Sequence, residues 1–161
     1  MVDALTPHWP ADAICTVSVT GFSATLITPT AIHMLSGRDQ PANTARGDDP
    51  VSLWLSPGRV LVVGFTDATP PAGNFVSDLT HGQAVFRLTG AALADILAMG
   101  TSLDPALLAP GHCAQTLFAG VKTLLYRHGE ALHLHVDRPL AAFVAAWLAQ
   151  AATALEGFSP S

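Results

Sequence analysis

Charged residues are scarce in this chain of 161 amino acids, where Asp, Glu, Lys and Arg make up 12% of the sequence, about half of their share in an ordinary soluble domain. Lysine occurs once, as Lys122, and seven basic residues stand against twelve acidic ones, for a net charge of −5. Proteins that bind nucleic acid need clustered cations to neutralise phosphates. We therefore expect no nucleic-acid partner, and a hydrophobic content of 50% excludes intrinsic disorder.

The shortage of charge leaves two possible compositions for the protein surface. A domain of this size keeps about a third of its unfolded surface exposed after folding. Either small neutral residues cover that surface, or a large apolar area is buried against another chain. We favour burial against another chain and keep the neutral surface as the alternative.

Cysteine and the common cofactor motifs are also nearly absent. Cys15 and Cys113 lie far apart, and no C-x-x-C pair occurs, so no redox pair or zinc site is predicted. Neither G-x-G-x-x-G nor G-x-x-x-x-G-K-[ST] is present, and we expect this chain to bind no FAD or NAD. No G-x-S-x-G motif occurs, and the trio Ser77, Asp78 and His81 on one strand and its turn is of a kind that arises by chance.

Signals for a membrane or secretory route are missing as well. Residues 1–10 contain no basic segment followed by an apolar core, so no signal peptide is predicted and we expect a cytoplasmic protein. The uncharged stretch 139–155 approaches the minimum of about 17 residues for a membrane span. It is mostly alanine and contains Gln150 and Thr153, and we predict a buried helix there and no membrane partner.

Turn residues and apolar alternation divide the chain into two predicted lobes, with the boundary in the proline-containing segment 67–73. The first lobe, residues 1–73, is smaller and rich in strands, with an exposed loop over 36–50. Its strands are predicted at 14–20, 24–28, 51–55 and 59–65.

The second lobe, residues 74–161, combines strands with helices. Its strands are predicted at 75–79, 83–89, 113–118, 122–127 and 131–136, and its helices over 90–100, from 104 onward and over 138–157. Thr89, Asp104 and Asp137 are the predicted caps of these helices. The order of elements predicts an α+β fold with a mostly antiparallel sheet and helices on one face, the second lobe being ferredoxin-like.

The last predicted helix carries no charge on either side. Its core stripe is expected to contain Leu140, Phe143, Val144, Trp147, Leu148, Ala151 and Leu155. The opposite side carries Ala141, Ala142, Ala145, Ala149, Gln150 and Thr153. A surface helix normally has charges on its outer side, so we predict that both sides of this helix are buried.

The sharpest candidate for a metal site is the pair His133 and His135, because residues two apart on a strand project to the same side. These histidines could share a metal with Asp137 or His128. The competing interpretation places the alternating apolar residues of the strand in the core and both histidines on its polar side. Those apolar residues are Leu132, Leu134 and Val136. We favour this second interpretation and predict no metal-binding residue.

The basic residues offer no catalytic pattern. Arg127 and Arg138 are interpreted as structural or interface charges, and Lys122 has no acidic residue nearby in sequence that would mark a perturbed site. The sequence therefore predicts no catalytic residue and no cofactor-binding residue in this chain. Taken alone, the residues indicate a subunit.

Several short segments resemble two related families. Residues 76–81 and 86–90 resemble the opening pattern of the glycine-cleavage T-protein superfamily of folate-dependent aminomethyltransferases. A longer string of segments, in shared order over about residues 51–153, resembles the gamma subunit of heterotetrameric sarcosine oxidase. Its segments are Leu53-Trp54-Leu55-Ser56-Pro57, Thr101-Ser102-Leu103-Asp104, Pro110-Gly111-His112-Cys113-Ala114-Gln115-Thr116, Leu125-Tyr126-Arg127 and Trp147-Leu148.

This resemblance implies a small subunit with the T-protein fold but without T-protein chemistry. In the family, such a subunit packs on a large alpha subunit, with beta and delta subunits in the same complex. The complex would demethylate sarcosine or a related N-methyl amine with FAD, FMN and bound NAD, and would pass the one-carbon unit to tetrahydrofolate or release formaldehyde. The resemblance assigns all of these cofactors to the other subunits.

The resemblance also leaves alternatives. A related dehydrogenase acting on N-methylglutamate or dimethylglycine would contain a similar gamma chain. A stand-alone folate-binding transferase is a second alternative, although Lys122 and Thr123 occupy the place where the T-protein family has an acidic pair. A homo-oligomeric binding module without an oxidase partner is the third.

Overall fold

The computed structural model describes residues 16–66, 72 and 75–157 of the chain. The strands are β1 (Thr16–Val19), β2 (Phe22–Ile27), β3 (Ala31–Ser36), β4 (Ala45–Arg46), β5 (Val51–Ser56), β6 (Arg59–Gly64), β7 (Phe75–Asp78), β8 (Gln83–Thr89), β9 (Cys113–Phe118), β10 (Val121–His128) and β11 (Ala131–Asp137). The helices are α1 (Leu93–Gly100) and α2 (Ala141–Gly157), with single-turn 3₁₀ helices η1 (Pro105–Leu108) and η2 (Arg138–Leu140).

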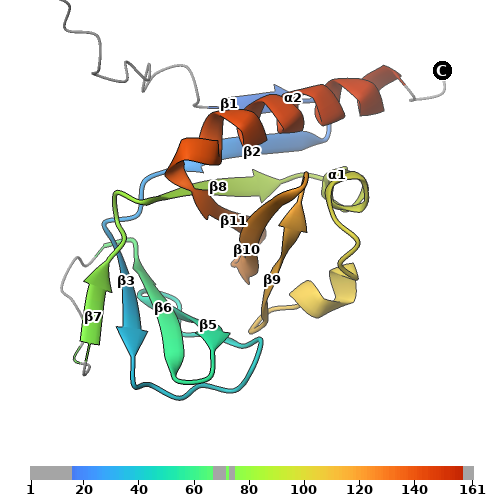
Figure 1. The fold of residues 1–161 in the computed structure, drawn as a ribbon. Coiled ribbons are helices and arrows are strands. Elements are labelled where there is room, and N and C mark those ends of the chain that lie inside the picture. Colours follow the sequence, from blue (N-terminus) through green and yellow to red (C-terminus); the bar gives the residue numbers. More distant parts are fainter. Residues whose placement is uncertain (1–15, 67–71, 73–74, 158–161) are drawn as a thin grey trace, which may run out of the picture.

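The strands form two antiparallel sheets, and Figure 1 shows the five-stranded sheet below the six-stranded one. One sheet has six strands in the order β1-β2-β8-β11-β10-β9, and the other has five in the order β4-β5-β6-β3-β7. Helix α2 covers one side of the six-stranded sheet, and the five-stranded sheet lies on the other side (Figure 1). The predicted α+β class, with a mostly antiparallel sheet and the helices on one face, is confirmed.

Each face of the six-stranded sheet has its own core. Phe86, Leu125 and Leu134 pack toward the helices, together with Ile96 of α1 and Leu148 of α2. The alternate positions of the same strands pack against the five-stranded sheet, and the residues that meet there include Val85, Leu124, Tyr126, Ile32, Leu53 and Val63. The six-stranded sheet is thus a central layer that is covered on both sides.

The two sheets do not divide the chain at the predicted lobe boundary. Strands β1 and β2 precede residue 73, yet β2 pairs with β8 in the six-stranded sheet. Strand β7 follows that boundary but pairs with β3 in the five-stranded sheet. Strand pairing joins distant parts of the chain, and local composition does not specify the partner.

Strand β3 has no counterpart among the predicted strands. It lies between β6 and β7, and four of its six residues are buried, on both faces of the strand. A strand covered on both sides shows no alternation of apolar and polar residues, so its pattern resembles no half-buried strand. The predicted loop over 36–50 is mostly exposed but contains the short strand β4.

Local signals located the predicted hairpin and one of the predicted caps correctly. Strands β5 and β6 pair across a turn in which Gly58 has a φ of 71°, as the Pro57-Gly58 sequence predicts. The carboxylate of Asp104 accepts a hydrogen bond of 2.9 Å from the Ala106 amide and caps η1.

Of the two other predicted caps, Thr89 is wrong, and Asp137 has the predicted position but makes no capping hydrogen bond. Helix α1 is preceded by Ala92 at its cap position, not by Thr89. Asp137 precedes η2 without a side-chain cap, and its Oδ1 accepts a hydrogen bond of 2.8 Å from Gln83 Nε2 on β8 instead. The Asp137 carboxylate therefore accepts a hydrogen bond from the side chain of Gln83 on β8 and not from the main chain of η2.

Helix α2 ends at Gly157 as predicted, but it is rotated relative to the predicted stripe. Its buried residues are Ala141, Val144, Leu148, Ala151 and Ala152. Two residues assigned to the core, Leu140 and Phe143, are 37% and 49% exposed. Alanine side chains let the helix approach the sheet closely, so they occupy the inner side while the larger Phe143 points outward.

Candidate functional site

A group of titratable side chains lies inside the molecule, around Tyr126. The Tyr126 hydroxyl lies 3.0 Å from Nδ1 of His133 and 3.3 Å from Nε2 of His135. Tyr126 on β10 stands directly opposite His133 on β11 in the strand register. The three residues therefore form one hydrogen-bonded cluster on the side of the central sheet that faces the five-stranded sheet.

The sequence interpretation that placed both histidines on a solvent-facing side is wrong. His133 is 3% exposed and His135 is 1% exposed. Every residue of β11 from Ala131 to Val136 is buried, because the helices cover one side of the strand and the five-stranded sheet covers the other. The alternation of leucine and histidine correctly predicted that the two residue types lie on opposite sides of the strand, but both sides are buried.

The cluster is neutral at pH 7. Burial, with smaller contributions from the charges of His128 and Arg87, lowers the pKa of His133 to about 4. Burial also lowers the pKa of His135 to about 3, and it raises the pKa of Tyr126. The hydroxyl can donate to only one ring, so the other ring must donate to it. The cluster suits a structural role and not acid–base catalysis.

The candidate metal ligands are only partly brought together. The ring of His128 lies beside that of His133, with centroids 5.2 Å apart, whereas Asp137 has a separate partner. Nε2 of His128 lies 2.7 Å from the carbonyl oxygen of Asp48, and its ring stacks on Phe65 with centroids 4.9 Å apart. Asp137 is engaged with Gln83 at the surface. Among residues 16–66, 72 and 75–157, no group of three or more His, Cys, Asp and Glu side chains is placed to hold a metal ion.

The trio Ser77, Asp78 and His81 forms no catalytic arrangement. The Asp78 carboxylate accepts a hydrogen bond of 2.9 Å from the Thr80 amide, and hydrogen bonds from Thr80 lower its pKa. The carboxylate is directed into its own turn and does not orient His81 toward Ser77.

The two cysteines differ in what the structure shows of them. Cys113 is buried, and its thiol donates a hydrogen bond of 3.2 Å to the carbonyl of Thr44. Burial raises its pKa to about 11, so the thiol is protonated and a poor nucleophile. Cys15 lies outside the described residues.

The basic residues contribute to structure or lie at the surface. Nε of Arg127 donates a hydrogen bond of 3.1 Å to the carbonyl of Leu108 and so fastens η1 to β10. Lys122 and Arg138 are exposed. Thr123, which follows Lys122, is 3% exposed and donates its hydroxyl to the carbonyl of Thr116.

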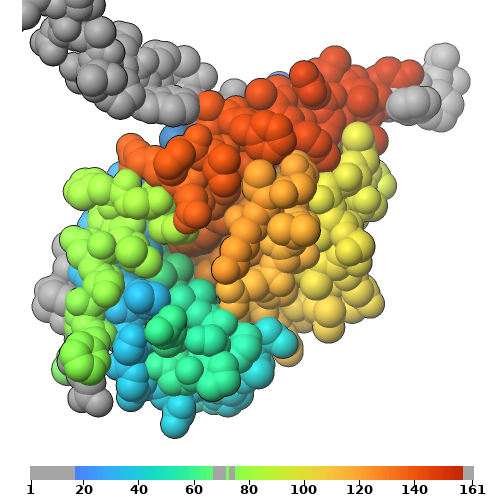
Figure 2. Space-filling view, in the orientation of Figure 1, coloured from blue at the N-terminus to red at the C-terminus, as the bar shows by residue number. Residues whose placement is uncertain are grey.

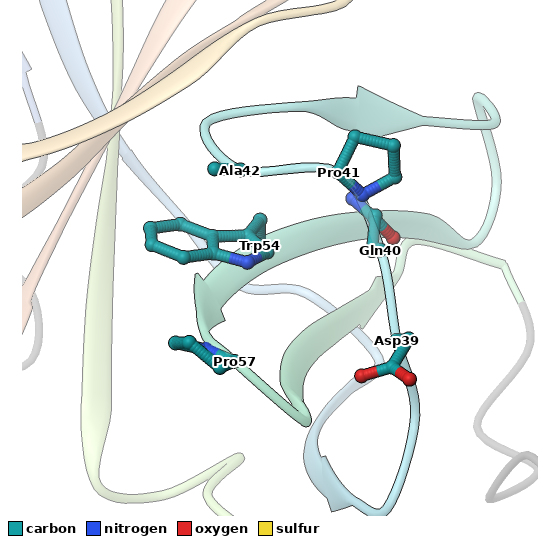
Figure 3. A pocket seen from close by; sticks show the side chains of 6 residues that line it. All are labelled: Asp39, Gln40, Pro41, Ala42, Trp54 and Pro57. Carbon is teal, nitrogen blue, oxygen red and sulfur yellow. The ribbon is translucent and has the colours of Figure 1, made fainter.

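An open hollow of about 460 Å³ lies between β5 and residues 39–42 (Figure 3). These four residues belong to the segment that the sequence predicted as an exposed loop. The lining residues of the hollow are Asp39, Gln40, Pro41, Ala42, Trp54 and Pro57. Gln40 fixes the loop by donating to the carbonyls of Thr44 and Ser52 at 2.7 and 3.0 Å. The lining of the hollow has one ionisable side chain, the Asp39 carboxylate, with no second ionisable group and no hydroxyl or thiol side chain beside it, so it presents no pair of catalytic groups.

An apolar part of the surface lies where α2 meets β9. Trp147 of α2 and the buried Phe118 of β9 are in edge-to-face contact, with ring centroids 4.9 Å apart. One exposed hydrophobic side chain lies on each of α1, η1, β9 and α2, and Figure 2 shows α2 lying against the strands of that region. With their exposed fractions they are Met99 (49%), Leu107 (55%), Leu117 (61%) and Phe143 (49%).

We call the exposed Phe143 and the partly buried Trp147, which follows it by one turn of α2 and contacts Phe118 of β9, the α2–β9 surface. Beside it, Ala119 donates a hydrogen bond of 2.8 Å to the carbonyl of Gly100 and so fixes the end of α1 next to β9. Helix α2 has no charged residue between Arg138 and Glu156. The sequence predicted that both sides of this helix are buried, but Phe143, Gln150 and Thr153 on its outer side are exposed in the structure of this chain.

The composition of α2 also fits a membrane span. The stretch Arg138–Gly157 is 20 residues long and apolar enough to cross a bilayer by length and composition alone. A single helix of this kind is weak evidence, because core helices pass the same test. Here Val144 and Leu148 are fully buried on the central sheet, which favours the interpretation as a packed helix.

Comparison with known proteins gives one informative result. No protein-family model matches the sequence, and a search of curated proteins finds no match. A solved structure of heterotetrameric sarcosine oxidase from Corynebacterium sp. U-96, in complex with pyrrole 2-carboxylate, contains a chain of similar fold. The TM-score is 0.73 at 18% sequence identity, and the similarity covers 94% of this chain and 92% of that chain. The two chains therefore share a fold over nearly their whole lengths.

Proposed function

We propose that this chain is a non-catalytic gamma-type subunit of a flavoenzyme resembling heterotetrameric sarcosine oxidase. In this proposal the complete enzyme oxidatively demethylates sarcosine or a related N-methyl amine in the cytoplasm. The chain packs on a large alpha subunit and stabilises it, with beta and delta subunits in the same assembly. The observation that carries the proposal is the fold shared with a chain of sarcosine oxidase over 94% of this chain and 92% of the other.

The chemistry of the described residues supports a role without catalysis. The central histidines are sealed between the sheets with lowered pKa values. The thiol of Cys113 is buried and protonated. In the proposal, FAD, FMN, NAD and tetrahydrofolate are bound by the other subunits, and this chain binds none of them.

The α2–β9 surface supports a role as a subunit. Phe143 is 49% exposed, and burying such a side chain against a partner stabilises a complex by about 25 cal/mol for each Å² of apolar area removed from water. Helix α2 carries no charged residue before Glu156 that would have to be desolvated. A large apolar protein surface is therefore the partner that it fits.

The test is purification of the tagged chain from its native source. We expect a larger polypeptide to co-purify, the preparation to show flavin absorbance, and sarcosine or another N-methyl amine to drive hydrogen peroxide formation or dye reduction. Comparing sarcosine, N-methylglutamate and dimethylglycine distinguishes the alternative complexes. Recovery of the chain as a flavin-free monomer, or tight binding of tetrahydrofolate by the isolated chain, would contradict the proposal.

A further inference from the structure

A second pocket, of about 290 Å³, lies where the turn between β10 and β11 meets the loop that leads into β5. Three segments of the chain line it, namely residues of the stretch 45–51, residues 110–111 and residues 127–129. It is more enclosed than the hollow beside β5 and more polar. Ligand pockets of proteins have volumes of about 300–1,000 Å³, so this pocket suits a small molecule.

Hydrogen bonds hold the three segments in place. Ala45 donates its amide to the carbonyl of Gly111 at 2.8 Å. Nε2 of His128 lies 2.7 Å from the carbonyl oxygen of Asp48, which can only accept, so this nitrogen carries the hydrogen. Nε of Arg127 donates to the carbonyl of Leu108, just before the second segment. The pocket is therefore formed before any ligand binds, as ligand pockets usually are.

Two opposite charges line this pocket without pairing. Beyond the bond from Nε, the terminal nitrogens of Arg127 have no partner in the part of the chain that the structure describes. The carboxylate of Asp48 likewise accepts no hydrogen bond from residues 16–66, 72 and 75–157, and it forms no ion pair with Arg127.

The neighbouring carboxylate behaves differently. The two oxygens of Asp49 accept hydrogen bonds of 2.8 Å from the Phe65 amide and 2.6 Å from the Thr66 hydroxyl. Asp49 therefore has a structural task, whereas the side chain of Asp48 is exposed and free to meet a ligand.

This pair of charges selects for a molecule that carries both signs. A simple anion would be attracted by Arg127 but repelled by Asp48, and a simple cation would meet the reverse. A zwitterion gains from both groups. The planar guanidinium suits a carboxylate, which it can bind through two parallel hydrogen bonds, and a carboxylate such as that of Asp48 accepts hydrogen bonds from an ammonium group.

We infer that this pocket binds a small zwitterion of the amino-acid class, with its carboxylate on Arg127 and its amine on Asp48. Neither a hydroxyl nor a thiol side chain lines the pocket, so the inference is one of binding and not of reaction. It does not depend on the proposed function, because all the groups that it invokes belong to this chain.

The test is a nuclear magnetic resonance titration of the ¹⁵N-labelled full chain with glycine, acetate and methylammonium as separate probes. Glycine carries both charges, and each of the other two carries one of them. We expect glycine to shift the amide signals of Gly47, Gly111 and Gly129, which line the pocket, in a saturable manner. Acetate and methylammonium should each bind about tenfold more weakly or less, because each loses one charged partner.

The sharpest variant is Asp48→Asn. It removes the charge but keeps the size of the side chain and the main-chain carbonyl that His128 contacts. We expect glycine to bind about tenfold more weakly and acetate to bind at least as well as before, because the repulsion is gone. Loss of the fold could not produce these opposite changes. The matched control is Asp39→Asn, which makes the same change of charge at the hollow beside β5 and should alter neither affinity.

A second variant tests the other charge. Arg127→Gln should abolish the binding of glycine and of acetate. Since Arg127 also fastens η1, folding is checked by circular dichroism, and retained binding of methylammonium would show that the pocket is still present. Glycine binding that survives in folded Arg127→Gln would overturn the inference.

Three other results would overturn it as well. They are an absence of glycine-dependent shifts around the pocket, glycine binding no tighter than that of acetate, and equal glycine binding by Asp48→Asn and the wild type. None of them bears on the proposed function, which depends on the fold shared with a sarcosine oxidase chain. If glycine binds as expected but no large subunit co-purifies, the proposed function fails and this inference stands.

Discussion

The indole ring of Trp147 meets the phenyl ring of Phe118 edge to face, at a centroid distance of 4.9 Å and an interplanar angle of 74°. Phe118 is fully buried and also contacts α1, because a Cβ atom added to Gly100 would lie 2.4 Å from its ring. One aromatic side chain therefore sets the spacing between α1, α2 and the edge strand β9. Trp147 also belongs to the α2–β9 surface.

Replacing Gly100 by alanine should lower stability. The new methyl group would overlap the Phe118 ring, and overpacking of this kind costs about 1–3 kcal/mol, more than the roughly 1 kcal/mol that alanine contributes in a helix. The double variant Gly100→Ala with Phe118→Leu should regain part of the loss. Urea unfolding measures both. Gly157→Ala is the control, because its added Cβ meets no atom within 4 Å; equal stability of Gly100→Ala and wild type would contradict the packing described.

Substitution of Phe143 should separate binding from folding. Phe143 is 49% exposed, while its neighbour Val144 is fully buried. Phe143→Ser should change the free energy of unfolding by about 0.5 kcal/mol or less, yet weaken binding to the large subunit about tenfold or more. Val144→Ala should do the reverse, with lower stability and unchanged affinity of the folded chain. Thermal unfolding and co-purification give the two readouts, and a Phe143→Ser variant that binds normally would remove α2 from the interface.

The same helix shows which features the sequence could predict. Its length and its end at Gly157 follow from local signals, and so does the hairpin turn at Gly58. Its rotation does not, because apolar and alanine residues surround the helix and no charged side marks the exterior. Close packing then decided that alanines face the sheet and Phe143 faces outward. Where two sides of an element are chemically similar, tertiary packing chooses between them.

The histidines of β11 show the second limit of sequence reasoning. The alternation of His133 and His135 with leucines gives the period of a strand correctly. It cannot show that a second sheet, built from the first half of the chain and β7, covers the histidine side. The hydroxyl partner of both rings, Tyr126, lies on the neighbouring strand. The residues that the sequence offered as candidate metal ligands, His133 and His135, therefore belong to a buried hydrogen-bonded cluster, which depends on contacts with residues distant in sequence.

The buried histidines should make the protein sensitive to acid. Their folded pKa values of about 4 for His133 and about 3 for His135 lie below the ordinary value of 6.5, so the unfolded state binds more protons below that value. The contribution of the two neutral histidines to the free energy of unfolding is fully present above pH 6.5. It decreases as the pH falls from 6.5 toward their folded pKa values, by about 1.4 kcal/mol per pH unit for each histidine. Urea unfolding between about pH 7 and about pH 5 measures the slope.

The control for this pH dependence is His135→Gln, which cannot titrate. Its absolute stability will be lower, but the slope of stability against pH over the same interval should fall by about half, because one of two titrating groups is removed. The lowered pKa of Asp49 and of Asp78 acts below their ordinary value of 3.8, outside this interval. An unchanged slope in His135→Gln would show that other groups cause the acid sensitivity.

Removing the Tyr126 hydroxyl should lower stability and leave catalysis by the complex unchanged. Nδ1 of His135 already lacks a hydrogen-bond partner among the described residues, and Tyr126→Phe would leave Nε2 without one as well, at a cost of about 1–3 kcal/mol. The double variant Tyr126→Phe with His135→Leu replaces both partners by apolar groups and should recover part of that loss. A double-mutant cycle by urea unfolding gives the coupling energy. The turnover of the N-methyl amine is compared between complexes that contain the wild-type chain and complexes that contain folded Tyr126→Phe. A slower turnover per bound Tyr126→Phe subunit would show that the cluster takes part in the reaction. The non-catalytic role proposed for this chain would then be wrong.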